Sequence, residues 1–139
     1  MKSFTDIEQS KKLAETLPIE SADMHYIRKR YDFRGNPVDG EWSHPKYGNP
    51  NSKHADYIVQ IFESYEKIPC WSLAALINAL PISIKFKDDE YYLRFMKEYV
   101  EYANDEISLT GRCLHTTGND NLVDACYEMI LKLKEENLL

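Results

Sequence analysis

The residues that could support binding chemistry begin with a basic cluster, Arg28, Lys29, Arg30 and Arg34, in an otherwise acidic chain. In an extended strand Arg28 and Arg30 point to one face and Lys29 to the other, because successive side chains alternate. Two neighbouring guanidinium groups can hold a phosphate or a carboxylate through paired hydrogen bonds. The cluster therefore predicts a contact site for a small anion.

Aromatic residues follow this cluster in a segment that is rich in glycine and proline. Residues 34–53 hold three of the five glycines and three of the six prolines, a composition typical of a long loop. Its rings offer stacking surfaces for a planar ligand. The candidate ligand-binding residues are Arg28, Arg30, Arg34, Trp42, His44 and Tyr47. The alternative is that the arginines pair with the surplus of Asp and Glu on a solvated face.

Cys70 lies just before a predicted helix, where free N–H groups and the helix dipole can stabilise a thiolate. No histidine or aspartate follows it at a recognisable spacing, and Trp71 is adjacent. A buried thiol that packs beside a core tryptophan is the alternative that this context favours.

The other cysteines could be imagined in a zinc site. Cys113 and His115, with His44 and His54, supply suitable ligands, but the C-x-H spacing is not that of a zinc motif. We therefore expect no metal and no cofactor. The odd number and wide spacing of the three cysteines also argue against a disulfide framework.

Sequence motifs for catalysis are absent. The chain contains no G-x-S-x-G, P-loop, H-E-x-x-H or G-x-G-x-x-G pattern. The sequence thus leans against an enzyme without excluding one, since active sites assemble in space rather than along the chain.

Several local patterns predict secondary structure in the first half of the chain. Thr5 and Glu8 form a capping box for a first helix that Pro18 ends, and residues 24–33 favour a strand. Residues 55–66 carry an apolar stripe at helical spacing, although a strand also fits.

The second half begins with a short helix, residues 73–80, for which Ser72 is the expected N-cap. Residues 82–86 alternate as in a half-buried strand, and residues 88–90 form a polar turn. Residues 91–103 fit either a helix or a strand; their aromatic content and the preceding turn favour two antiparallel strands. Residues 108–117 predict another strand.

The last helix is capped near Asp120 and presents an apolar face to the core. Glu128 and Lys132 form an i, i+4 pair on its outer side. The core residues expected from this helix are Cys126, Met129, Ile130 and Leu133. Of the four tyrosines at 91, 92, 99 and 102, we expect at least two in the core.

Length and composition are those of one globular domain. The 139 residues are 43% hydrophobic and 29% charged, with a net charge of −6 that disfavours nucleic acid as a partner. No apolar run approaches the roughly 20 residues of a spanning helix, and the first residues do not form a secretory signal. We expect a cytoplasmic protein that does not bind membranes. The predicted fold is a single α+β domain over residues 1–139, with three or four helices on one face of a small antiparallel sheet.

Three segments carry a resemblance to other proteins: residues 68–76 (IPCWSLAAL), residues 122–130 (LVDACYEMI) and residues 17–24 (LPIESADM). They resemble a group of small uncharacterised proteins that are common on prophages and integrated mobile elements of gut bacteria. The resemblance implies a similar genomic setting and lends support to strands between the two longer motifs. It implies no catalytic residue.

The expected function is a non-catalytic interaction module of a prophage or mobile element, with another protein as its partner. The main alternative is a binder or enzyme for a small anionic ligand that uses Arg28, Arg30 and the Trp42–Tyr47 segment. A third alternative is an acidic mimic of nucleic acid, suggested by the mild acidic excess between Cys70 and Thr110. The sequence does not indicate an oligomeric state.

Overall fold

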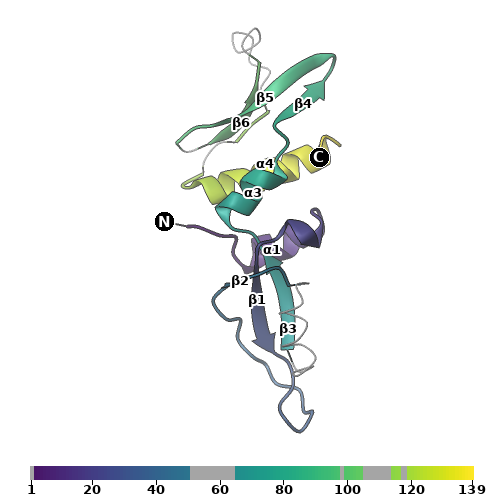
Figure 1. The fold of residues 1–139 in the computed structure, drawn as a ribbon, viewed down its shortest axis with the longest axis vertical. Helices are drawn as coiled ribbons and strands as arrows, with labels where there is room; N and C mark the ends of the chain where they lie inside the picture. The colour runs from purple at the N-terminus through teal and green to yellow at the C-terminus, as the bar shows by residue number, and fades with distance from the viewer. Residues whose placement is uncertain (1, 51–64, 98, 105–113, 117–118) are drawn as a thin grey trace. The chain divides into compact units, whose positions relative to one another are not determined.

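The computed structural model (Figure 1) describes residues 2–50, 65–97, 99–104, 114–116 and 119–139. Contacts divide the chain into two compact units. The N-terminal unit comprises residues 4–75, and the C-terminal unit comprises residues 1–3 with 76–139. Each unit is described by itself below.

The N-terminal unit combines a helix with a three-stranded antiparallel sheet in the order β2-β1-β3. The helix α1 packs against β3. A single 3₁₀ turn lies between the helix and the sheet. The element bounds are α1 Ile7–Ala14, η1 Ile19–Ser21, β1 Met24–Lys29, β2 Lys46–Tyr47 and β3 Tyr65–Cys70.

The helix α1 is capped one residue later than the sequence predicted. Asp6 accepts a hydrogen bond from the backbone N–H of Gln9 at 2.8 Å, and the Gln9 side chain accepts from the Asp6 N–H at 3.2 Å. Thr5, the predicted cap, is instead completely buried. The capping-box pattern thus identified the right turn of helix but the wrong residue.

The strands of this unit differ from the predictions at their ends. The strand β1 is confirmed from residue 24, but it ends at Lys29 rather than at residue 33. Tyr65 and Glu66 belong to β3 and not to the predicted helix of residues 55–66, the rest of which lies outside the described residues. The sequence did not predict a strand that includes Pro69. Proline lacks the N–H that a central strand needs. It is tolerated because β3 lies at the edge of the sheet.

The described part of the glycine- and proline-rich segment is tied back onto β1 by backbone hydrogen bonds. Val38 N–H donates to the carbonyl of Arg30 at 2.8 Å, and Gly40 N–H donates to that of Lys29 at 3.2 Å. A Cβ on Gly40 would lie 2.3 Å from the Lys29 carbonyl oxygen, so this close approach requires glycine. The predicted loop of residues 34–53 is therefore partly an ordered return along the sheet.

The core of the N-terminal unit lies where α1 meets the sheet. Trp71 is completely buried, and its indole N–H donates to the Ser21 hydroxyl at 2.9 Å. One cluster joins Met24, Tyr26 and Cys70, with Phe4, Ile7, Trp42 and Ile68 packed against it. Ser72 accepts a hydrogen bond from the Ala75 N–H at 3.2 Å, which confirms it as the N-cap of α3, Leu73–Ala79. The boundary between the units falls within this helix.

The C-terminal unit is built on a four-stranded antiparallel sheet in the order β4-β5-β6-β7. The strands that the sequence predicted in residues 82–86 and 91–103 are confirmed. The turn lies at Lys87 and Asp88, whose φ angles of 51° and 71° are those of a tight hairpin turn. The bounds are β4 Ser83–Phe86, β5 Asp89–Phe95, β6 Val100–Ala103, β7 Leu114–His115 and α4 Leu122–Glu135. Of the predicted strand at 108–117, residues 108–113 and 117 lie outside the described residues.

The helix α4 packs against β6 and β7 and supplies the interior of this unit. Its N-cap is Asn121, in agreement with the Asn/Asp cap predicted around Asp120; the Asn121 side chain accepts from the Asp124 N–H at 2.9 Å. Cys126, Met129, Ile130 and Leu133 are all completely buried, as predicted. The predicted Glu128–Lys132 ion pair is present at 3.0 Å. Tyr91 and Tyr102 are buried, while Tyr92 is 52% exposed.

The fold class α+β is confirmed, but the strands form two small antiparallel sheets rather than the one that was expected. Three α-helices lie within the described residues. The assignment of the whole chain to a single domain stays a prediction. No helix in the described part of the chain combines the length and apolar character needed to cross a membrane.

Candidate functional site

The predicted basic cluster lies at the end of the N-terminal sheet, and Arg28 is its best-fixed member. The register of β1 and β3 places Arg28 opposite Glu66. Its Nε–H donates to Oε2 of Glu66 at 2.6 Å, and its guanidinium carbon lies 4.7 Å from the centroid of the Trp42 ring. Charge pairing on one side and a cation–π contact on the other therefore hold this guanidinium in place.

Arg30 follows the end of β1 and lies on the same side of the sheet as Arg28, as the sequence predicted. Its Nε is 4.0 Å from the same Glu66 oxygen, at the outer limit of an ion pair, and its side chain is 55% exposed. One carboxylate thus faces two guanidinium groups. Arg30 therefore keeps most of its hydrogen-bonding capacity.

A small pocket of ≈ 220 Å³ opens beside these two arginines. Its volume is below the roughly 300–1,000 Å³ of typical small-molecule sites. It combines two cationic groups, one carboxylate and an apolar wall. The lining residues are Arg28, Arg30, Tyr31, Pro37, Val38 and Asp39.

Residues 28–40, called here the arginine hairpin, end in a hydrogen-bonded turn. The Asp32 side chain accepts from the backbone N–H groups of Arg34 at 2.8 Å and Asn36 at 2.9 Å. The bond from Asn36 and the bond from Arg34 lower the pKa of Asp32. Gly35 has a φ of 80°, a conformation that glycine adopts without strain. The turn is thus fixed by its own sequence.

This turn presents an aromatic side chain to solvent. Phe33 is 88% exposed, and the Arg34 guanidinium lies 5.3 Å from the centre of its ring. Tyr31 and Val38, which line the pocket, are 39% and 38% exposed. The hairpin therefore carries exposed apolar surface among basic groups.

The structure brings together only part of the predicted site. Arg28, Arg30 and Trp42 are close in space, but the Trp42 ring packs against the core and is also contacted by Arg28. Only Arg28 and Arg30 of the six candidates line the pocket, and Trp42 does not. Arg34 lies at the turn, and His44 and Tyr47 are exposed on the return segment and β2.

Sequence reasoning did not identify Glu66 and Asp39 as members of the site. Glu66 is separated from Arg28 by 38 positions, and only the pairing of β1 with β3 makes them neighbours. Asp39 lies within the predicted loop of residues 34–53. The signal that could have found Glu66 is a strand assignment for residues 65–70, because opposite charges are favourable across a strand pair.

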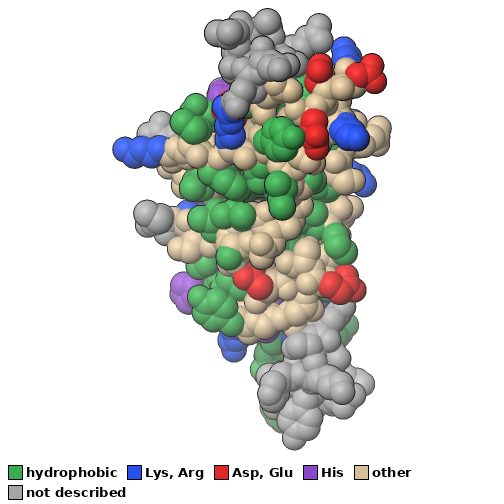
Figure 2. Space-filling view, turned by 45° about the horizontal axis from the view of Figure 1, so that its top comes forward, with side chains coloured by type: hydrophobic (Ala, Val, Ile, Leu, Met, Phe, Trp, Pro, Cys, Tyr) green, Lys and Arg blue, Asp and Glu red, His purple; other side chains and the backbone are tan. Residues whose placement is uncertain are grey.

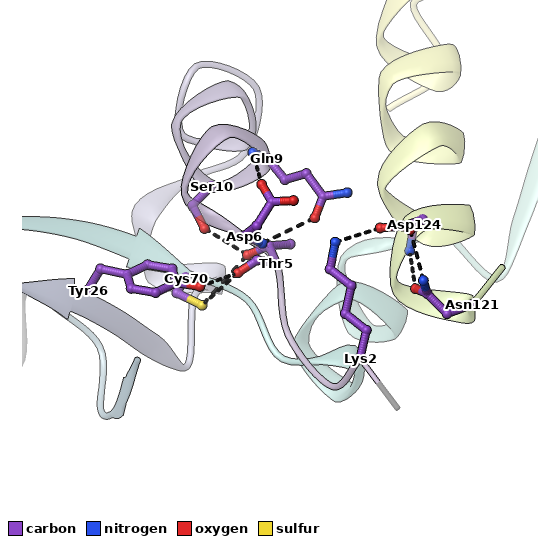
Figure 3. A network of polar contacts seen from close by, with 9 residues as sticks. All are labelled: Lys2, Thr5, Asp6, Gln9, Ser10, Tyr26, Cys70, Asn121 and Asp124. Carbon is purple, nitrogen blue, oxygen red and sulfur yellow. Dashed lines mark hydrogen bonds and ion pairs between the residues drawn. The ribbon is translucent and has the colours of Figure 1, made fainter. Parts of the chain in front are cut away.

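Cys70 has the properties of the buried thiol that the sequence favoured. It is completely buried at the end of β3, and burial raises its pKa. Its sulfur lies 3.6 Å from both the hydroxyl and the carbonyl oxygen of Thr5 (Figure 3). Burial also raises the pKa of Cys126 to about 12. Neither thiol is an activated nucleophile, because both are protonated at neutral pH.

The described residues contain no group of three or more His, Cys, Asp and Glu side chains arranged to hold a metal ion. Cys113 and His54, which belonged to the imagined zinc site, lie outside the described residues. The His115 ring instead packs against Tyr99, with their centroids 4.6 Å apart.

The acidic residues of the C-terminal sheet lie next to basic ones. Lys85 is paired with Glu90, and Arg94 with Glu101, across neighbouring strands. In Figure 2, acidic and basic side chains are interspersed at the top of the view. A mimic of nucleic acid needs carboxylates along one face, whereas each of these two described acids lies opposite a base. Glu98, Asp105 and Glu106 of the acidic segment lie outside the described residues.

Comparisons of the chain with protein-family models, with curated proteins and with solved structures find no match.

Proposed function

We propose that this protein is a non-catalytic protein-binding module that contacts its partner through the arginine hairpin. The observation that carries the proposal is the 88% exposure of Phe33 at the apex of a turn whose backbone is already fixed. Burying a phenylalanine side chain contributes about 1.5–3 kcal/mol. That free energy is available to a partner that covers Phe33.

The turn supports the proposal through its rigidity. Asp32 binds two backbone N–H groups, and its own N–H donates to the Asn36 carbonyl at 2.9 Å. A surface that is ordered before binding loses less conformational entropy when the partner arrives. The backbone hydrogen bonds from Val38 to Arg30 and from Gly40 to Lys29 extend this order to the base of the hairpin.

The composition of the hairpin surface also supports a protein partner. Aromatic residues and arginine are enriched at protein interfaces and at their energetic centres. Phe33 and Tyr31 supply the aromatic surface, and Arg30 and Arg34 supply the charge. The role in a prophage or mobile element is proposed from the sequence motifs alone.

A binder of a small anionic ligand is the second candidate, and the pocket beside Arg28 and Arg30 favours it. We rank it lower for two reasons. The pocket is smaller than typical ligand sites, and Arg28 already forms a hydrogen-bonded ion pair with Glu66. The exposed Phe33 has no role in such a site, because it does not line the pocket.

The test compares two single substitutions of highly exposed aromatic residues in the same unit. Phe33→Ala removes the apex, whereas Tyr47→Ala is the matched control, since Tyr47 is 86% exposed on β2. Each tagged protein is incubated with lysate of the native host, and captured proteins are quantified by mass spectrometry.

We expect a defined set of proteins to be captured by the wild type and by Tyr47→Ala and to be lost with Phe33→Ala. Identical capture by all three proteins would contradict the proposal. Both variants are expected to fold, because each removes a side chain that contributes little buried surface.

A further inference from the structure

We infer that the pocket beside the arginine hairpin receives an acidic side chain of the partner, with an apolar partner side chain next to it. This inference deepens the proposed function and rests on it: Phe33 provides the apolar anchor, and the pocket provides the charge recognition. Its ligand class is a peptide segment in which Glu or Asp adjoins an apolar residue.

The hydrogen-bonding state of Arg30 supports a carboxylate ligand. Its contact with Glu66 is 4.0 Å long, and more than half of its side chain is exposed. Among the described residues, Glu66 binds Arg28 much more closely, at 2.6 Å. The guanidinium of Arg30 can therefore form the planar, two-point contact with a carboxylate that arginine favours.

The charge around the pocket selects a monoanion. The guanidinium groups of Arg28 and Arg30 lie beside the carboxylate of Glu66, and Asp39 also lines the pocket. Lys29 and Arg34 add positive charge elsewhere on the hairpin, against Asp32. Over these seven groups the four cations exceed the three carboxylates by one, so one bound carboxylate brings the group to neutrality, whereas a phosphate dianion would leave it with a net negative charge.

The size and walls of the pocket indicate a peptide rather than a free metabolite. A volume of ≈ 220 Å³ holds one or two side chains but not a drug-sized molecule. Tyr31, Pro37 and Val38 form an apolar wall beside the arginines. Asp39 can accept a hydrogen bond from a backbone N–H of the peptide. These features match a carboxylate that is followed by an apolar side chain.

The probes are three acetylated and amidated tetrapeptides, Gly-Glu-Phe-Gly, Gly-Gln-Phe-Gly and Gly-phosphoSer-Phe-Gly. Each is titrated at low salt into the ¹⁵N-labelled full chain and followed by backbone chemical shifts. The Gln peptide matches the Glu peptide in size but lacks its charge. The phosphoserine peptide tests a dianion at the same position.

We expect the Glu peptide to shift the amides of Arg30, Tyr31 and Val38 with millimolar affinity. The Gln peptide should bind about fivefold more weakly, the ratio that a partly exposed ion pair supplies. Equal binding of the Glu and Gln peptides, tighter binding of the phosphoserine peptide, or no shifts at the pocket would each overturn the inference.

The matched protein variants are Arg30→Gln and Lys46→Gln. Both remove one positive charge from an exposed side chain of the N-terminal unit, but Lys46 does not line the pocket. Arg30→Gln should abolish the preference for Glu over Gln, while Lys46→Gln should retain it. Unchanged preference in Arg30→Gln contradicts the inference even if the peptide binds.

The two proposals can fail separately. If host proteins are captured in a Phe33-dependent manner but the peptides show no charge preference, the binding module stands and the pocket assignment falls. If capture does not depend on Phe33 but the Glu peptide binds at Arg30, the pocket is a carboxylate site. The proposal that the arginine hairpin binds a protein partner is then wrong.

Discussion

The two units bury their interiors in different ways. In the N-terminal unit a polar residue, Thr5, lies at the centre. Its hydroxyl contacts the Ser10 hydroxyl at 2.8 Å and accepts a hydrogen bond from the backbone N–H of Trp71 at 3.1 Å. Its carbonyl accepts from the Tyr26 hydroxyl at 2.7 Å (Figure 3). In the C-terminal unit, α4 inserts a face of wholly buried apolar side chains against β6 and β7.

The two interiors therefore hold the helices and strands around them in place by different interactions. Hydrogen bonds are directional, so the Thr5 network fixes the ends of β1 and β3 relative to the start of α1. Fixing these strands also fixes the strand pair that carries Arg28 and Glu66. Apolar packing is not directional, and its strength follows the area and volume buried. We therefore expect α4 to contribute more stability and the Thr5 network to contribute more geometric definition.

The largest expected effect comes from shortening an apolar side chain of α4. Leu133 is completely buried, so Leu133→Ala should lower the free energy of unfolding by about 2–5 kcal/mol through lost burial and a residual cavity. Urea denaturation measures the change. Leu139→Ala, at a residue that is 43% exposed, is the control and should have little effect. If Leu133→Ala lowers the free energy of unfolding by less than about 1 kcal/mol, α4 does not contribute more stability than the Thr5 network.

The next effect tests the polar interior. Thr5→Val keeps the side-chain shape but removes the acceptor of the buried backbone N–H of Trp71. The free energy of unfolding should fall by about 1–3 kcal/mol. Amide hydrogen exchange should also accelerate at Trp71. The control is Thr16→Val near the end of α1, where the hydroxyl is only partly buried. Full retention of stability in Thr5→Val would show that the network has no energetic role.

A third prediction concerns alkaline pH and the thiol of α4. The pKa of Cys126 is about 12 in the folded chain and about 8.5 in an unfolded one. As pH rises, the Cys126 thiol loses its proton first in the unfolded state. The stability that the protonated thiol contributes to the folded state is therefore complete below about pH 8.5 and is lost as pH rises towards 12. Within that window the free energy of unfolding should fall by up to about 1.4 kcal/mol per pH unit more than in Cys126→Ala. Parallel pH profiles from pH 8 to 10.5 would contradict this.

The smallest effect is expected at the surface of α4. Burial alone would raise the pKa of Glu128, but hydrogen bonds from Asn119 and Lys132 outweigh it and lower the pKa. The ionised Glu128 carboxylate therefore stabilises the folded state above its unfolded pKa of about 4.3. This stabilisation is lost as pH falls through the pKa that Glu128 has in the folded state. Glu128→Gln should cost no more than about 0.5 kcal/mol at neutral pH and nothing in acid. A cost that persists at low pH, measured by urea denaturation, would exclude the ionic origin.

Most local features could be predicted from the sequence. The antiparallel strands predicted within residues 82–86 and 91–103, the Ser72 cap and the Glu128–Lys132 pair are confirmed, although Asp89 and Glu90, predicted in the turn, begin β5. Each depends on alternation or on neighbours no more than four positions apart. The errors lie at element ends, such as Asp6 in place of Thr5 as the cap of α1, where adjacent polar residues compete for one cap.

The candidate site could be predicted only in part. The strand pattern correctly placed Arg28 and Arg30 on one side, because alternation is a local property. It could not show that Glu66 neutralises Arg28, that Trp42 is covered, or that Asp39 and Val38 complete a pocket. Those outcomes depend on the pairing of β1 with β3 and on the return of residues 37–43 along β1.

The sequence by itself determined the basic cluster of residues 28–34, the Ser72 cap of α3 and the apolar face of α4. These depend on the chemistry of single residues and on contacts within one turn or along one strand. Only the tertiary structure decided which charges remain available, which rings are exposed and which thiols are inert. Burial and charge pairing are set by residues far apart in the chain, as with Arg28 and Glu66 or Thr5 and Cys70.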